Sequence, residues 1–128
     1  MSVSPRMFAD SAVVLSKGEY EIDWRNSISR SYYAAYHLAT ESSTLCPPTD
    51  NLETGKHEQL ARRFQLSKSS DGKVIAQALF LMKRQRVIAD YKIELKTTHL
   101  DAQDQVEKYH QFTRRMISFC NTTKPVLG

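Results

Sequence analysis

The spacing of apolar residues predicts α-helices along nearly the whole chain. A first helix is expected to begin at Pro5, behind an N-cap at Ser4, and to end at Gly18. A second is expected to begin at Asp23 and to stop at residues 46–48, where a cysteine is followed by two prolines. The remaining helices are expected over residues 56–66, over residues 73–95 and from residue 98 onward.

No useful stretch shows the alternation of apolar and polar residues that marks a β-strand. Residues 49–55 are expected to form a loop, and Thr98 with Asp101 has the pattern of a capping box. The apolar stripe of the last helix is expected to consist of Val106, Tyr109, Phe112, Met116 and Cys120. The sequence therefore predicts one domain over residues 1–128, an all-α antiparallel bundle of four long helices plus one short helix.

The helix expected over residues 73–95 is apolar on two opposite sides when it is wound at about 3.6 residues per turn. One side carries Ile75, Leu79, Met82, Ala89 and Ile93. The other side carries Phe80, Val87, Ile88 and Tyr91. A helix with two apolar sides usually packs between two partners. Either it lies at the centre of one chain, or its second side forms the interface of a homodimer.

Arg86 stands in the middle of the first apolar side of this helix. A guanidinium there is costly to bury unless it is paired or faces a polar cleft. Asp90 follows one helical turn later and is close enough to form an ion pair. The pattern supports two interpretations, a structural ion pair or a phosphate-binding arginine.

The second helix carries hydrogen-bonding side chains opposite its apolar stripe. Asn26, Arg30, Tyr33 and His37 share this side, which is either a solvated surface or a set of donors for a phosphate. Arg30 and His37 are about 10 Å apart along the axis, so they can share only an extended ligand. His57, near the start of the short helix, is a further isolated histidine.

Composition adds weaker evidence. Lys and Arg outnumber Asp and Glu by 18 to 14, giving a net charge of +4 and a pI near 9.1, which suits nucleic-acid binding and an ordinary solvated surface equally well. The two cysteines lack the spacing of a metal site, and no phosphate-binding glycine loop occurs. We expect no cofactor and no metal, and a cytoplasmic protein without a membrane segment.

Three segments resemble one branch of the HEPN family. Residues 25–39 (RNSISRSYYAAYHLA) are similar to its R-x-Y-Y-A-x-[FY]-H pattern, and residues 54–64 (TGKHEQLARRF) to its short Lys-His segment. Residues 81–91 (LMKRQRVIADY) are similar to its Arg followed by Ala-Asp-Tyr. The order and spacing of the segments also agree, and with the helix order the resemblance covers nearly the whole chain.

The resemblance implies a HEPN-like homodimer, paired through its long helices, with a composite site at the subunit junction. It also implies metal-independent cleavage of RNA, as in toxin–antitoxin or phage-defence ribonucleases. Arg86 is then expected to stabilise the phosphate, and His37 or His57 to act as the base. The residues expected to hold the RNA are Asn26, Arg30, Tyr33 and Arg84.

An alternative follows from a departure from the family pattern. Catalytic members have a histidine shortly after the motif arginine, whereas here Tyr91, Lys92 and Ile93 occupy those positions. The chain is then a non-catalytic binding and dimerisation module that binds nucleotide or partners a minimal nucleotidyltransferase acting as its antitoxin. In that case Tyr91 is a candidate modification site, with Asp90 as structural support.

Overall fold

The computed structural model describes residues 2–49 and 55–123, and it confirms the predicted all-α bundle. No strand occurs within these ranges, and most of the expected loop over residues 49–55 lies outside them. The helices are α1 (Pro5–Ser16), α2 (Glu21–Ser42), the short 3-10 helix η1 (Ser43–Leu45), α3 (Lys56–Leu66), α4 (Ser70–Tyr91) and α5 (His99–Thr122).

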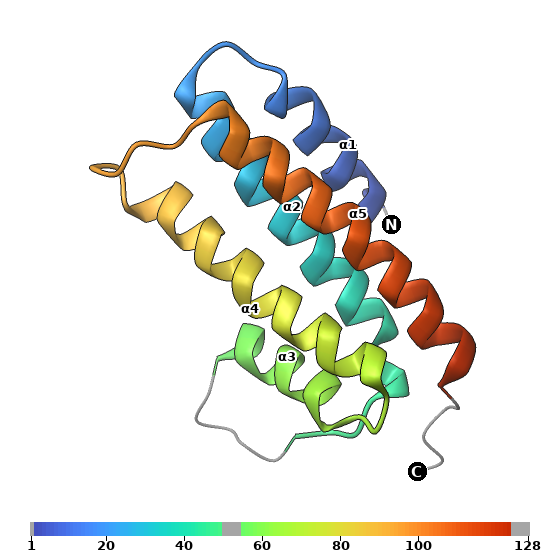
Figure 1. The fold of residues 1–128 in the computed structure, drawn as a ribbon. Coiled ribbons are helices and arrows are strands. Elements are labelled where there is room, and N and C mark those ends of the chain that lie inside the picture. The colour runs from blue at the N-terminus through green and yellow to red at the C-terminus, as the bar shows by residue number, and fades with distance from the viewer. Residues whose placement is uncertain (1, 50–54, 124–128) are drawn as a thin grey trace.

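Four helices, α1, α2, α4 and α5, lie side by side, and α3 packs on the outside of α4 (Figure 1). The central helix is α2, which contacts α1, α4 and α5. Small side chains permit this close packing, and almost no surface of Ser27, Ser31, Ala34, Ala35 and Ala39 is exposed. The remaining side of α2, between α1 and α4, carries the candidate site described below.

The core lies where α2, α3, α4 and α5 meet. Its largest fully buried side chains include Tyr32, Phe64, Ile75, Met82, Phe112 and Phe119. In α5 the predicted stripe is correct at Tyr109, Phe112 and Met116, but Cys120 is exposed and Phe119 is buried instead. The expected spacing drifted by one residue at the last turn because an α-helix repeats every 3.6 residues, not every 4.

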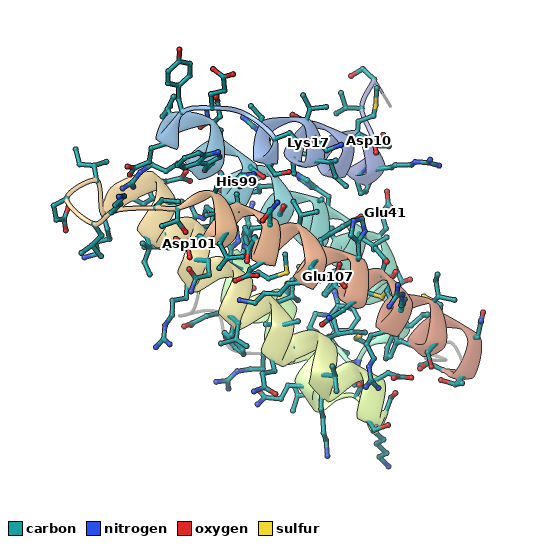
Figure 2. The ribbon with its side chains drawn as sticks, turned by 45° about the horizontal axis from the view of Figure 1, so that its top comes forward. Asp10, Lys17, Glu41, His99, Asp101 and Glu107 are labelled. Atoms are coloured by element: carbon teal, nitrogen blue, oxygen red, sulfur yellow. The ribbon has the colours of Figure 1, made fainter. Side chains whose placement is uncertain are left out.

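One side of α5 lies against α1, and carboxylates of neighbouring helices lie near its Tyr109. Figure 2 shows Asp10 on α1, Glu41 on α2 and Glu107 on α5 around this side. Burial, together with the carboxylates of Asp10 and Glu41, raises the pKa of Tyr109, so its hydroxyl stays protonated at neutral pH.

The helix ends follow local signals where these are present. The Ser4 hydroxyl accepts a hydrogen bond from the Met7 amide, and Thr98 with Asp101 forms the predicted capping box. The start of α4 differs from the prediction, because Ser69 acts as an N-cap and the helix begins at Ser70. The helix α2 also begins earlier than predicted, at Glu21.

The end of α4 is determined by Arg25, a buried residue of α2. Its guanidinium donates to the carbonyl oxygens of Ile88 (3.3 Å) and Ala89 (2.9 Å), and to that of Leu95 in the following turn. The bond to Ala89 satisfies a carbonyl that a helix leaves unpaired at its end, whereas the carbonyl of Ile88 also accepts from the Lys92 amide. The bonds from Arg25 hold the chain in a turn after Tyr91, so the predicted helical segment to residue 95 was wrong at its end, and Ile93 is exposed.

The second apolar side of α4 is not buried within the chain. Phe80 is 41% exposed and Tyr91 69% exposed, while Val87 and Ile88 are half-buried. The interpretation that α4 is packed on both sides within one chain is therefore wrong. Among the helices of the described ranges, none has both the length and the apolar character to cross a membrane.

We predict that Arg25→Ala lowers the free energy of unfolding by about 3 kcal/mol, because it removes the buried donors for the end of α4 and leaves Glu21 with one partner fewer. Arg30→Ala is the matched control, since Arg30 is exposed on the same helix and its guanidinium lies over the ring of Phe8. Urea unfolding measures both variants. Equal midpoints for the two would contradict the role given to Arg25.

Candidate active site

The side of α2 between α1 and α4 carries the predicted site. It faces the Arg86 side chain of α4, whose guanidinium carbon lies 5.7 Å from the ring centre of Tyr32 and 5.5 Å from that of Tyr33. The ring of Tyr91, at 5.8 Å, lies on the guanidinium as well. Arg86 is only 8% exposed. Three aromatic rings therefore provide most of the favourable environment for a nearly buried positive charge.

The hydrogen bonding of Arg86 is incomplete. Its Nη1 lies 3.7 Å from Asp90 Oδ2, which confirms the predicted pairing but is too long for a strong hydrogen bond. Asp90 Oδ2 also accepts a hydrogen bond from the Ser29 hydroxyl at 3.1 Å. Arg86 Nε is buried and has no hydrogen-bond partner among the described residues. A buried donor of this kind without an acceptor is costly.

His57 reaches the same site from α3. Its Nδ1 lies 2.5 Å from the Tyr32 hydroxyl, and its ring centre lies 4.5 Å from that of Tyr36. Burial lowers the pKa of His57 below its usual value, and the nearby cations Lys83 and Arg86 lower it further. His57 is therefore neutral at pH 7, which is the state that can accept a proton.

The Tyr32 hydroxyl pairs with Nδ1 of His57, and the tautomer of His57 decides which of the two donates. Burial raises the pKa of Tyr32 well above its usual value, so this hydroxyl remains protonated at physiological pH. When His57 Nδ1 carries its proton and donates to the Tyr32 oxygen, Nε2 is left with a free electron pair. In that tautomer His57 is able to act as a base at Nε2.

His37 lies on the other side of the tyrosines. Its ring centre is 5.0 Å from that of Phe8 on α1 and 5.4 Å from that of Tyr36, which also contacts His57. Arg30 lies over the same Phe8 ring at 5.7 Å. The two histidines thus flank one aromatic group, and each shares a tyrosine with Arg86: His57 contacts Tyr32, and His37 contacts Tyr33.

The structure brings most of the predicted site residues together. Arg86, His57, Tyr33, Asp90 and Tyr91 form one cluster, with His37 and Arg30 at its edge. Asn26 and Arg84 are exposed and join none of the described contacts of this cluster.

Sequence reasoning missed three members of the cluster. Tyr32 lies within the motif of residues 25–39 but received no role in the site, although it contacts His57. Tyr36 and Lys83 likewise lie within the quoted segments but received no role, although Tyr36 contacts His57 and the charge of Lys83 lowers the pKa of His57. The signal available was the run of tyrosines at positions 32, 33 and 36, one helical turn of aromatic rings.

Comparisons with known proteins do not identify the chain, because no family model, curated protein or solved structure matches it. The chemistry must therefore be argued from the site itself. The cluster combines a buried guanidinium with a free donor, a neutral histidine and several aromatic rings. These groups suit an anionic ligand with a planar part, such as a nucleotide.

We predict that His57 makes stability depend on pH below its usual pKa of 6.5. Because the folded pKa is lowered, the unfolded chain binds more protons, so stability is lost as pH falls from about 7 to about 5. His57→Gln should remove this part of the pH dependence while leaving that of the other groups. Urea unfolding of both proteins across this range measures it. Parallel curves would show that the His57 pKa is not lowered by folding.

Proposed function

We propose that the protein is an RNA-directed HEPN-type protein that cleaves RNA without a metal ion, as part of a cytoplasmic toxin–antitoxin or phage-defence system. The observation that carries the proposal is the buried Arg86 guanidinium, with an unpartnered Nε, beside neutral His57. Arginine is the side chain best suited to bind phosphate oxygens, and histidine is the commonest base at neutral pH.

The proposed reaction uses the ribose 2′-hydroxyl as the nucleophile. His57 Nε2 takes the proton of this hydroxyl while its oxygen attacks the adjacent phosphorus. The bond from phosphorus to the 5′-oxygen breaks, leaving a 2′,3′-cyclic phosphate, and the 5′-oxygen takes a proton from water or from protonated His37. Arg86 stabilises the negative charge that develops on the non-bridging oxygens. The partly buried rings of Tyr33 and Tyr36 offer surfaces on which a base can stack.

A homodimer through α4 is part of the proposal. The surface formed by Phe80, Val87 and Tyr91 is exposed at Phe80 and Tyr91 and half-buried at Val87, and its Tyr91 lies beside Arg86. Pairing two chains across this surface would bury these residues and bring two Arg86 side chains to one cleft. A composite site of this kind would bind successive phosphates of one RNA strand.

We predict that Arg86→Ala and His57→Ala each lower the rate of RNA cleavage by about 100-fold, with chelator present, because one removes charge stabilisation and the other the base. His37→Ala should have a smaller effect, since Arg86 is close enough to His57 to lower its pKa, whereas His37 lies beyond the ring of Tyr33. The exposed Arg62 on α3 provides the control, and Arg62→Ala should cleave at the wild-type rate.

The assay uses a labelled single-stranded RNA, with products identified by mass as 2′,3′-cyclic phosphates and light scattering used to confirm the oligomeric state. Cleavage that is unchanged in Arg86→Ala would point to a contaminating nuclease. No cleavage by folded wild-type protein would contradict the ribonuclease proposal.

The exposure of Tyr91 favours a second candidate function. Its hydroxyl-bearing ring is 69% exposed while also covering Arg86, so a nucleotidyl group added there would carry its phosphate near the guanidinium. The protein would then be a non-catalytic module modified by a minimal nucleotidyltransferase. Incubation with such an enzyme and ATP should add the mass of one nucleotidyl group to wild type and none to Tyr91→Phe. An unmodified wild type would count against this function.

A further inference from the structure

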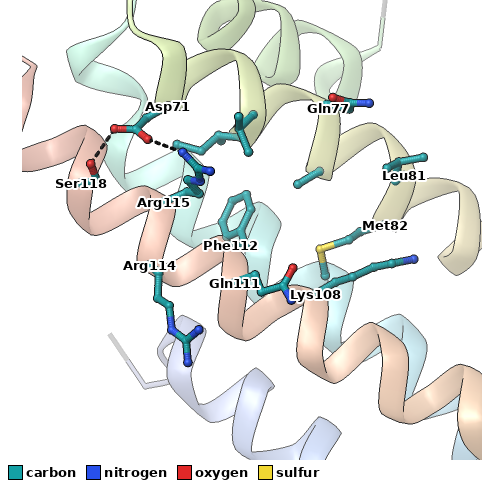
Figure 3. A pocket seen from close by; sticks show the side chains of 13 residues that line it. Asp71, Gln77, Leu81, Met82, Lys108, Gln111, Phe112, Arg114, Arg115 and Ser118 are labelled. Carbon is teal, nitrogen blue, oxygen red and sulfur yellow. Dashed lines mark hydrogen bonds and ion pairs between the residues drawn. The ribbon is translucent and has the colours of Figure 1, made fainter.

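A groove of about 760 Å³ runs between α4 and α5, away from the Arg86 cluster. Its floor is formed by the buried side chains of Ile75, Met82 and Phe112. Figure 3 shows Gln77 and Leu81 on the α4 wall, and Lys108, Gln111 and Arg115 on the α5 wall. The two walls differ in chemistry, and this difference indicates what the groove accommodates.

The α4 wall has the spacing of a coiled-coil seam. Successive steps of four and three residues connect Val74, Ala78 and Leu81 on this wall, and Gln85 continues the spacing beyond the groove. Val74 is 39% exposed and Leu81 44% exposed, although the adjacent floor residues are fully buried. This seam is separate from the uncovered Phe80 surface, which lies about a quarter turn or more around the helix. A helix that matches the seam would cover apolar side chains that the chain itself leaves in water.

The α5 wall is polar and positively charged. Lys108, Gln111, Arg115 and Ser118 follow one another in steps of three, four and three residues, with Arg114 at the edge. The groove is thus lined by three cations and by one carboxylate, that of Asp71. Asp71 already accepts hydrogen bonds from Ser118 (2.6 Å) and Arg115 (3.1 Å), which lower its pKa and keep it ionised (Figure 3). The wall therefore presents a net positive charge to an incoming group.

We propose that this groove binds an amphipathic helix of a partner protein, with its apolar seam on α4 and a row of Asp and Glu residues facing α5. The seam provides the apolar contact, and the charges of Lys108 and Arg114 select an acidic partner. A second copy of this chain fits less well. Pairing two α4 seams would bring Lys73 and Arg84, exposed on α4, toward the cations of the other copy's α5.

The test uses two synthetic helical peptides, each labelled with a fluorophore and about three heptads long. Both carry Leu at the a and d positions, and the flanking e and g positions are Glu in one and Lys in the other. Fluorescence anisotropy against the full chain should show saturable binding of the Glu peptide and about tenfold weaker binding of the Lys peptide. Lys108→Glu with Arg114→Glu should reverse this preference.

Two matched substitutions on α4 locate the binding site. Leu81→Glu places a charge in the groove and should weaken binding of the Glu peptide about tenfold or more, whereas Phe80→Glu, equally exposed but outside the groove, should leave it unchanged. Circular dichroism confirms that both variants fold. Equal binding of the two peptides, no binding, or equal effects of the two substitutions would overturn the proposal.

Sedimentation of the same variants tests whether a second copy of the chain, and not a partner helix, occupies the groove. If wild type is a dimer that Leu81→Glu dissociates and Phe80→Glu does not, the groove holds a second copy of the chain and the proposal is overturned. If Phe80→Glu alone dissociates a dimer, the groove is free for a partner, as proposed. RNA cleavage does not enter these readouts, so the outcome is independent of the proposed catalytic function.

Discussion

The hydrogen bonds from Arg25 to the last carbonyls of α4 determine how α2 and α4 lie against each other. The two helices are antiparallel (Figure 1), so each turn of α2 beyond Arg25 meets an earlier turn of α4. Ser29 accordingly meets Asp90, and Tyr33 meets Arg86. A shift of one residue along either helix would separate these pairs, because neighbouring residues point about 100° apart. The site therefore depends on a contact at one end of the bundle.

The same register explains why a charge at a core position is tolerated. In place of water, the Arg86 guanidinium is surrounded by three aromatic rings and one distant carboxylate. These groups compensate its charge but leave Nε without an acceptor among the described residues. An arginine with a purely structural role can have its donors bonded within the fold, as the guanidinium of Arg25 does. The contrast between these two buried arginines is the reason why we propose a role beyond packing for Arg86.

Sequence patterns predicted the features that depend on neighbours in the chain. The cap at Ser4, the capping box at Thr98 and the Arg86–Asp90 pair each involve residues within one helical turn. The end of α4 was missed because it depends on Arg25, more than sixty residues away in sequence. The pairing of Tyr32 with His57 was missed for the same reason, since it requires α3 to dock beside α2 and α4. The spacing of apolar residues predicts which side of each helix is buried, but not which helices pack against each other.

The most direct test of the account is the NMR signal of the Arg86 Nε–H group, assigned by its loss in Arg86→Lys, during titration with a nucleoside 3′-monophosphate. If this donor binds a phosphate, its proton should move downfield saturably and exchange more slowly with water. The exposed Arg30 and Arg84 serve as internal references for non-specific charge effects. An Arg86 signal that stays unchanged while those of Arg30 and Arg84 shift would show that the buried guanidinium has a structural role only.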